Sequence, residues 1–75
     1  MELQFMKHTP GEKLTMLRQK ARRSKAETAG LLNLTLHIYV ALEEDFLYPS
    51  DMMFHKIAKL YGITYDQLLA VGEPP

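Results

Sequence analysis

Cysteine is absent from this chain of 75 residues. Its absence excludes a disulfide framework and a metal site built on thiolates. The sequence also lacks any apolar run near the ~20 residues that a membrane-spanning helix needs, and it does not open with the pattern of a secretory leader. We therefore expect one soluble domain in the cytoplasm, without membrane association.

Signatures of catalysis and cofactor binding are lacking as well. The three histidines, His8, His37 and His55, are scattered, with no i, i+4 pair that would ligate a metal. No glycine-rich phosphate loop is present, and no serine or lysine has a base placed beside it by local spacing. We expect a protein that is not an enzyme and that uses no metal, no cofactor and no small-molecule substrate.

Acidic residues are scarce in one third of the chain. Glu12 is the single acid between positions 7 and 25, where seven of the nine basic residues lie. These basic residues are Lys7, Lys13, Arg18, Lys20, Arg22, Arg23 and Lys25. From residue 26 onward two lysines accompany seven acids, although the formal net charge of the chain is zero. The basic segment can attract phosphate, or it can be an ordinary solvated helix face.

Capping signals divide the sequence into five short helices. A capping box has Ser or Thr at the N-cap and Glu or Gln three residues later, and each satisfies a free amide of the first turn. This pattern occurs three times, at 9–12, 24–27 and 64–67. Thr35 and Ser50 are further N-cap candidates. Asn33 and Gly62 tolerate the left-handed conformation that ends a helix, and 45–49 is expected to be a loop.

Apolar residues repeat with helical spacing inside these segments. The residues expected to point inward are Leu14, Leu17 and Ala21, then Ala29 and Leu32, then Leu34, Tyr39 and Leu42, then Phe54, Ile57, Ala58 and Tyr61. We predict an all-α domain over residues 9–71, followed by a tail at 72–75. Residues 1–8 form an N-terminal arm whose alternating apolar side chains fit a short strand, an extended arm or a frayed terminus.

Two short helices joined at Asn33, with small Ala29 in the first and Leu34 before the second, have the spacing of a helix-turn-helix. Around this unit, residues 11–69 resemble the Cro/phage-repressor (XRE-type) domain with no gap. The landmarks are Gly11-Glu12-Lys13-Leu14, Leu17-Arg18, Ser24, Ala29, Leu34, Leu42-Glu43, Pro49-Ser50, Ile57-Ala58, Gly62-Ile63 and Leu68-Leu69. The resemblance implies a compact five-helix repressor-like fold and a transcriptional regulator that inserts its third helix, about 35–44, in the major groove of double-stranded DNA.

The resemblance also implies roles for individual residues. Arg18 on the first helix and Glu43 at the end of the third correspond to a structural salt bridge of the family. Contacts with DNA phosphates fall on Arg22, Arg23, Ser24 and Lys25. Contacts with base edges fall on Thr35, Leu36, His37, Val40 and Ala41.

The third helix and the loop after it depart from the family's pattern. Base edges are usually read by Arg, Lys, Asn or Gln, whereas only Thr35 and His37 of the base-edge set can form hydrogen bonds. In the following loop, Glu44 and Asp45 would repel a phosphate backbone. The alternative hypothesis is a degenerate helix-turn-helix that binds a protein partner through an apolar surface. Its residues would be Leu36, Ile38, Val40, Phe46 and Leu47.

A homodimer is expected, because one small module buries little surface on DNA. The candidate dimer surface joins the last helix to the arm, through Tyr65, Leu68, Leu69 and Val71 and through Met1–Met6. A dimer formed by the apolar residues of the third helix would instead block access to DNA.

Overall fold

A computed structural model describes residues 8–74, and the regular structure within them is entirely helical. The five helices are α1 (Pro10–Lys20), α2 (Lys25–Leu31), α3 (Leu36–Glu43), α4 (Asp51–Tyr61) and α5 (Tyr65–Leu69). The predicted all-α domain of five helices is confirmed. The expected arm, apart from His8, lies outside the described residues. None of the five helices combines the length and the apolar character needed to cross a bilayer.

Each of these helices begins at a hydroxyl cap. The cap oxygen accepts a hydrogen bond from the backbone N–H three residues later at Thr9, Ser24, Thr35, Ser50 and Thr64. All three predicted capping boxes are complete, because Glu12, Glu27 and Gln67 accept the backbone N–H of their caps in return. Helices this short are marginal in water by themselves, so they depend on their caps and on tertiary packing.

A residue with left-handed backbone follows each of the first four helices. The φ angle is 59° at Arg22, 61° at Asn33, 63° at Asp45 and 67° at Gly62. The stops at Asn33 and Gly62 are those that the sequence predicts. Arg22 and Asp45 were not expected there, because arginine rarely adopts this conformation and Asp45 was read only as an acid of the loop.

All five helices contribute to one apolar core. Its buried members are Leu14, Ala29, Leu32, Tyr39, Leu42, Phe54, Ile57, Ala58 and Leu68. Leu17, Leu34 and Tyr61 pack against this core and are partly buried. The expectation for Ala21 is wrong: it is exposed, because α1 ends at Lys20 and Ala21 forms the C-cap.

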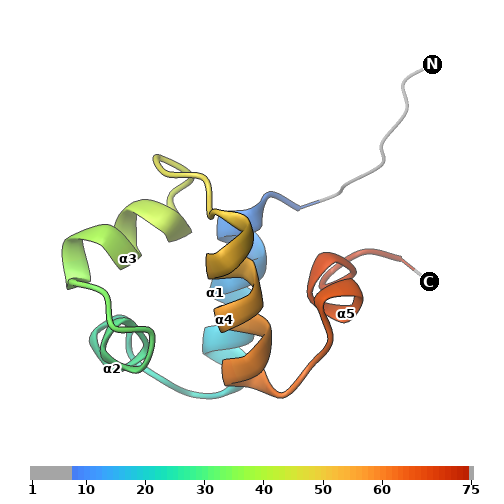
Figure 1. The fold of residues 1–75 in the computed structure, drawn as a ribbon, viewed down its shortest axis with the longest axis horizontal. Helices are drawn as coiled ribbons and strands as arrows, with labels where there is room; N and C mark the ends of the chain where they lie inside the picture. The colour runs from blue at the N-terminus through green and yellow to red at the C-terminus, as the bar shows by residue number, and fades with distance from the viewer. Residues whose placement is uncertain (1–7, 75) are drawn as a thin grey trace.

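The helices are arranged around a central pair. α1 and α4 lie in the middle of the molecule, with α2 and α3 on one side and α5 on the other (Figure 1). α2 is seen end-on while α3 lies across the view, so the two helices cross, as in a helix-turn-helix. α3 packs against both α1 and α2, and no other helix covers its outer side in this view.

Gly11 allows the start of α1 to lie directly against the end of α3. A Cβ at this position would lie 2.7 Å from the carbonyl oxygen of Leu42 and closer still to that of Glu43. The N–H of Gly11 donates to Asp45 Oδ1 at 2.9 Å, and the hydroxyl of Thr9 donates to the other carboxylate oxygen. A side chain at position 11 would therefore separate the two helix ends.

Gly11→Ala should destabilise the protein by about 1–3 kcal/mol, because the two atoms nearest to the new methyl group are backbone carbonyl oxygens that cannot move aside cheaply. The matched control is Gly30→Ala in α2, where nothing lies within 4 Å of the new methyl group. The control should stabilise the protein by up to about 1 kcal/mol through helix propensity. Urea denaturation followed by circular dichroism measures both. A shift of the two variants in the same direction would contradict the close approach at Gly11.

Candidate nucleic-acid interface

Glu43 fixes α3 against α1 and thereby sets the orientation of the outer face of α3. Arg18 Nε lies 2.6 Å from Glu43 Oε2, and the two side chains are only 12% and 4% exposed. The hydroxyl of Thr15 donates to Glu43 Oε1 at 3.0 Å, and the phenol of Tyr39 donates to Oε2. The predicted ion pair of Arg18 and Glu43 is present. The sequence did not reveal the two neutral hydrogen-bond donors, Thr15 and Tyr39, that complete the network around the carboxylate.

The protonation states follow from these contacts. Burial raises the pKa of Glu43, but hydrogen bonds from Arg18, Tyr39 and Thr15 outweigh burial and hold that pKa below its ordinary value. The hydrogen bond to Glu43 raises the pKa of Arg18. Burial, and then the hydrogen bond to Glu43, raises the pKa of Tyr39. The carboxylate and the guanidinium therefore both stay charged at neutral pH and compensate each other inside the molecule.

Lys13 is a second cation that the fold withdraws from the surface. Only 3% of the surface of Lys13 is exposed. The ammonium donates to the carbonyl oxygen of Leu69 and lies 3.3 Å from Glu73 Oε2. The basic segment is therefore smaller than the sequence suggested. Among the described residues, the cations of this segment that lie outside these two ion pairs are Lys20, Arg22, Arg23 and Lys25.

The expected phosphate-contacting residues lie around the turn between α1 and α2. Arg22, Ser24 and Lys25 are exposed. Arg23 is half-buried, with its guanidinium carbon 5.8 Å from the ring centre of Tyr61. The hydroxyl of Ser24 accepts the N–H of Glu27 as a cap, which places an acid at the start of α2. Arg22 and Lys25 are therefore the most accessible cations of the expected set.

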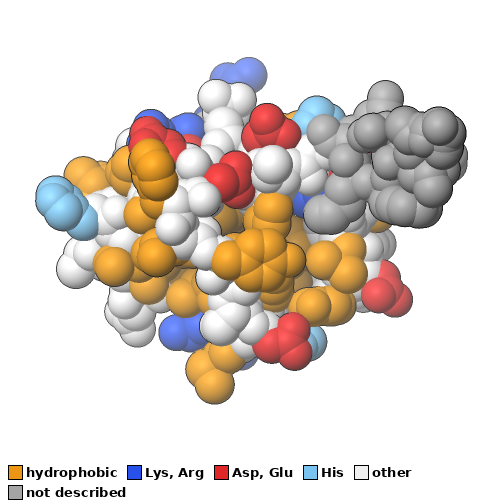
Figure 2. All heavy atoms as spheres, turned by 90° about the horizontal axis from the view of Figure 1, so that it is seen from above, with side chains coloured by type: hydrophobic (Ala, Val, Ile, Leu, Met, Phe, Trp, Pro, Cys, Tyr) orange, Lys and Arg blue, Asp and Glu red, His pale blue; other side chains and the backbone are white. Residues whose placement is uncertain are grey.

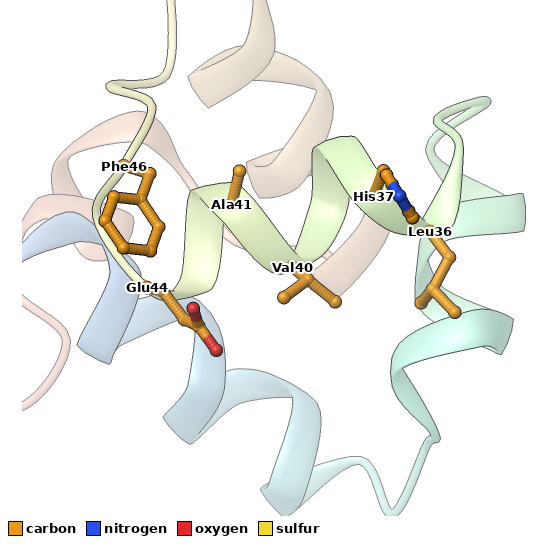
Figure 3. Close-up of a pocket in the computed structure, with 6 residues that line it drawn as sticks. All are labelled: Leu36, His37, Val40, Ala41, Glu44 and Phe46. Carbon is orange, nitrogen blue, oxygen red and sulfur yellow. The ribbon is translucent and has the colours of Figure 1, made fainter.

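The expected base-edge residues lie on the outer face of α3. Leu36, His37, Val40 and Ala41 line a depression of about 440 Å³ together with Glu44 and Phe46 (Figure 3). Thr35 stands at the N-cap instead, where its hydroxyl accepts the N–H of Ile38. Viewed from above, the molecule has hydrophobic side chains over much of its surface, with acidic side chains among them (Figure 2).

The residues of the alternative docking surface are only partly brought together. Leu36, Val40 and Phe46 share the depression, and Phe46 is 78% exposed. Ile38 and Leu47 are exposed but do not line it. The exposed apolar residues outside the sequence prediction include Leu31 at the end of α2, and also Tyr48 and Met52. Tyr48 lies in the loop after α3 and Met52 lies in the first turn of α4, where the helical pattern is too short to separate inward from outward positions.

The two acids after α3 have different surroundings. The carboxylate of Asp45 accepts hydrogen bonds from Thr9 and Gly11, so its charge is directed at the positive end of α1. Glu44 lines the depression beside Val40. Glu44 is therefore the acid that meets any ligand of the outer face of α3.

The dimer surface expected on α5 is largely used within the chain. Leu68 is 2% exposed in the core, and Tyr65 and Val71 pack against it. Tyr65 also stacks on His55, with ring centres 4.7 Å apart, and its hydroxyl donates to Asp51. The expectation that Leu68 is available to a second copy is therefore wrong. The arm Met1–Met6 lies outside the described residues.

Glu43→Gln should lower the free energy of unfolding at pH 7 by about 3 kcal/mol, because it leaves the charge of Arg18 buried without its partner. Since folding lowers the pKa of Glu43, its contribution is present above the unfolded value near 4.5 and is lost as the pH falls through the folded value. The variant should therefore lose less stability than the wild type below about pH 4.5. Thermal unfolding from pH 7 to pH 3 measures this.

The control is Glu44→Gln, at an exposed residue, with an expected change within about 0.5 kcal/mol at pH 7. If Glu43→Gln and the wild type lost equal stability in acid, the role of Glu43 would be contradicted.

Comparison of the chain with protein-family models, curated proteins and solved structures finds no match. Membership of the Cro/phage-repressor family therefore stays a prediction from the sequence landmarks. Within the part of the chain that the structure describes, no three His, Asp or Glu side chains converge so that they could hold a metal ion. Any functional proposal depends on the geometry of α2, α3 and the turn before them.

Proposed function

We propose that this protein is a DNA-binding regulator of the helix-turn-helix type that places α3 in the major groove. The observation that carries the proposal is the division of α3 into two faces. Tyr39, Leu42 and Glu43 are buried against the rest of the domain, while Leu36 and His37 are exposed. A helix held rigidly on one side and open on the other has the dimensions that the major groove admits.

Phosphate contacts are assigned to the turn that precedes α2. Arg22 and Lys25 are exposed there, and Lys20 at the end of α1 adds a third accessible cation. Cations on phosphates release condensed counterions, which supplies affinity without sequence preference. Arg23 contributes less to this surface, because its guanidinium packs against Tyr61.

Base contacts are assigned to the apolar face of α3. Thymine differs from the other DNA bases by a methyl group in the major groove, and apolar side chains read that group by direct contact. Leu36, Val40 and Ala41 are the side chains that can do so. His37 supplies the hydrogen-bonding group among them. We therefore propose a preference for A·T-rich duplexes.

Replacing Arg22 with Asn and Lys25 with Glu should weaken binding to all duplexes alike. The slope of log affinity against log salt concentration should become shallower by the equivalent of about one or two phosphate contacts. Asparagine tolerates the left-handed backbone at position 22. Fluorescence anisotropy with labelled duplexes at several salt concentrations measures the effect. The matched control, Lys56→Gln with Lys59→Glu on α4, makes the same change in net charge. No binding of the wild type to any duplex at low salt would reject the proposal.

Substituting deoxyuridine for thymidine in an A·T-rich duplex should lower affinity by about fourfold for each methyl group contacted, which corresponds to the burial of one carbon. The slope of affinity against salt should stay unchanged, because the phosphates are the same. Competition titrations with the two duplexes measure both quantities. Equal affinity for the thymidine and deoxyuridine duplexes would show that α3 does not read the methyl group.

A second candidate function is the binding of a protein through the outer face of α3. The observation that favours it is the chemistry of the depression, where four of the six lining residues are apolar and one, Glu44, is an acid that opposes phosphate. Exposed apolar surface of this kind is typical of protein contacts. The duplex titrations separate the candidates, because a protein that uses α3 only for protein contacts would bind no duplex specifically.

A further inference from the structure

The depression on α3 has a chemistry that is complementary to itself. Apolar side chains fill its middle, at Val40 and Ala41. At the start of α3 it presents Leu36 and the hydrogen-bonding ring of His37, and at the end it presents the carboxylate of Glu44 and the ring of Phe46 (Figure 3). A partner that offers the same groups in reverse order would satisfy each of them.

The spacing of these residues is symmetric about Val40. Leu36 precedes it by four residues and Glu44 follows it by four, so both lie on the same side of the helix as Val40. Two copies of α3 that pack antiparallel about a two-fold axis at Val40 therefore bring Leu36 of each copy to Glu44 and Phe46 of the other. Such a contact is closed, because both copies use the same surface.

The polar groups at the two ends of α3 also favour a second copy of the chain as the partner. His37 in the first turn of α3 can donate an N–H to the carboxylate of Glu44 in the second copy, and the contact occurs twice in the pair. The antiparallel arrangement also places the positive end of each α3 near the negative end of the other. The small side chain of Ala41 beside the axis lets the two helices approach closely.

We propose that a second copy of this chain occupies the depression and forms a two-fold dimer through antiparallel α3 helices. The dimer goes beyond the proposed DNA binding and does not depend on it. It covers Leu36, His37, Val40 and Ala41, the residues assigned to base edges. Self-association and insertion of α3 in DNA therefore exclude each other, so the dimer is a reservoir that cannot bind DNA.

The absence of cysteine from the chain makes the test direct. In Val40→Cys, the two introduced thiols face each other across the axis within reach of a disulfide, so mild oxidation should give a covalent dimer on non-reducing gels. Ile38→Cys is the matched control, because this exposed residue of α3 does not line the depression. It should cross-link at least about tenfold more slowly. Equal rates for the two variants would overturn the proposed arrangement.

Sedimentation equilibrium of the wild type tests the dimer without any substitution. The mass should rise from 8.7 kDa toward twice that value as the concentration increases. Glu44→Lys should raise the dissociation constant by about tenfold, and the double variant with His37→Glu should restore it. A mass that stays at the monomer value up to roughly 1 mM would reject the dimer.

These experiments can reject the proposed dimer and the proposed DNA binding independently of each other. Oxidised Val40→Cys should bind no duplex, whereas the wild type should bind at the protein concentrations where it is monomeric. Duplex binding by the covalent dimer would overturn the mutual exclusion. Absence of duplex binding by the wild type would reject only the DNA proposal, because the mass and the cross-linking rates decide the dimer.

Discussion

The orientation of α3 depends on the carboxylate of Glu43. This group accepts hydrogen bonds from Arg18 and Thr15 of α1 and from Tyr39 of α3 itself, all in the interior. Without it, a guanidinium would be buried without an opposite charge, which costs several kcal/mol. A domain of this length has a total stability of roughly 4–11 kcal/mol. The interaction is therefore a large fraction of what keeps the helix-turn-helix unit attached to the rest of the fold.

The same network redistributes the charges of the chain. The sequence suggests a continuous basic segment at 7–25, but Arg18 and Lys13 neutralise Glu43 and Glu73 within the fold. Among the described residues, the accessible cations of this segment then gather around the turn before α2, while Glu44 lines the depression on α3. The proposed DNA binding uses both the cations of the turn and the apolar face of α3, whereas the proposed dimer uses the apolar face alone.

Most of the fold could be predicted from the sequence because its signals are local. The hydroxyl caps act within four residues, and the core positions follow from helical spacing, so the helix starts agree with the expectation. The burial of Lys13 could not be predicted, because its partners at Leu69 and Glu73 are more than fifty residues away in the chain. The contacts of Asp45 could not be predicted for a similar reason, since the groups that it binds belong to the start of α1. For the candidate site, the sequence located the face of α3, but only the packing could show that Ile38 and Leu47 lie apart from the depression.

The contact between Lys13 and the end of the chain has a consequence for how the domain can be shortened. α5 lies apart from the helix-turn-helix, on the side of the molecule opposite α2 and α3 (Figure 1). However, its last carbonyl group and the following glutamate solvate the ammonium of Lys13 in place of water. A fragment that ends after α4 would lose these contacts together with Leu68, which is buried in the core. The minimal folding unit therefore extends from α1 through Glu73, and the helix-turn-helix cannot be isolated from the C-terminal segment.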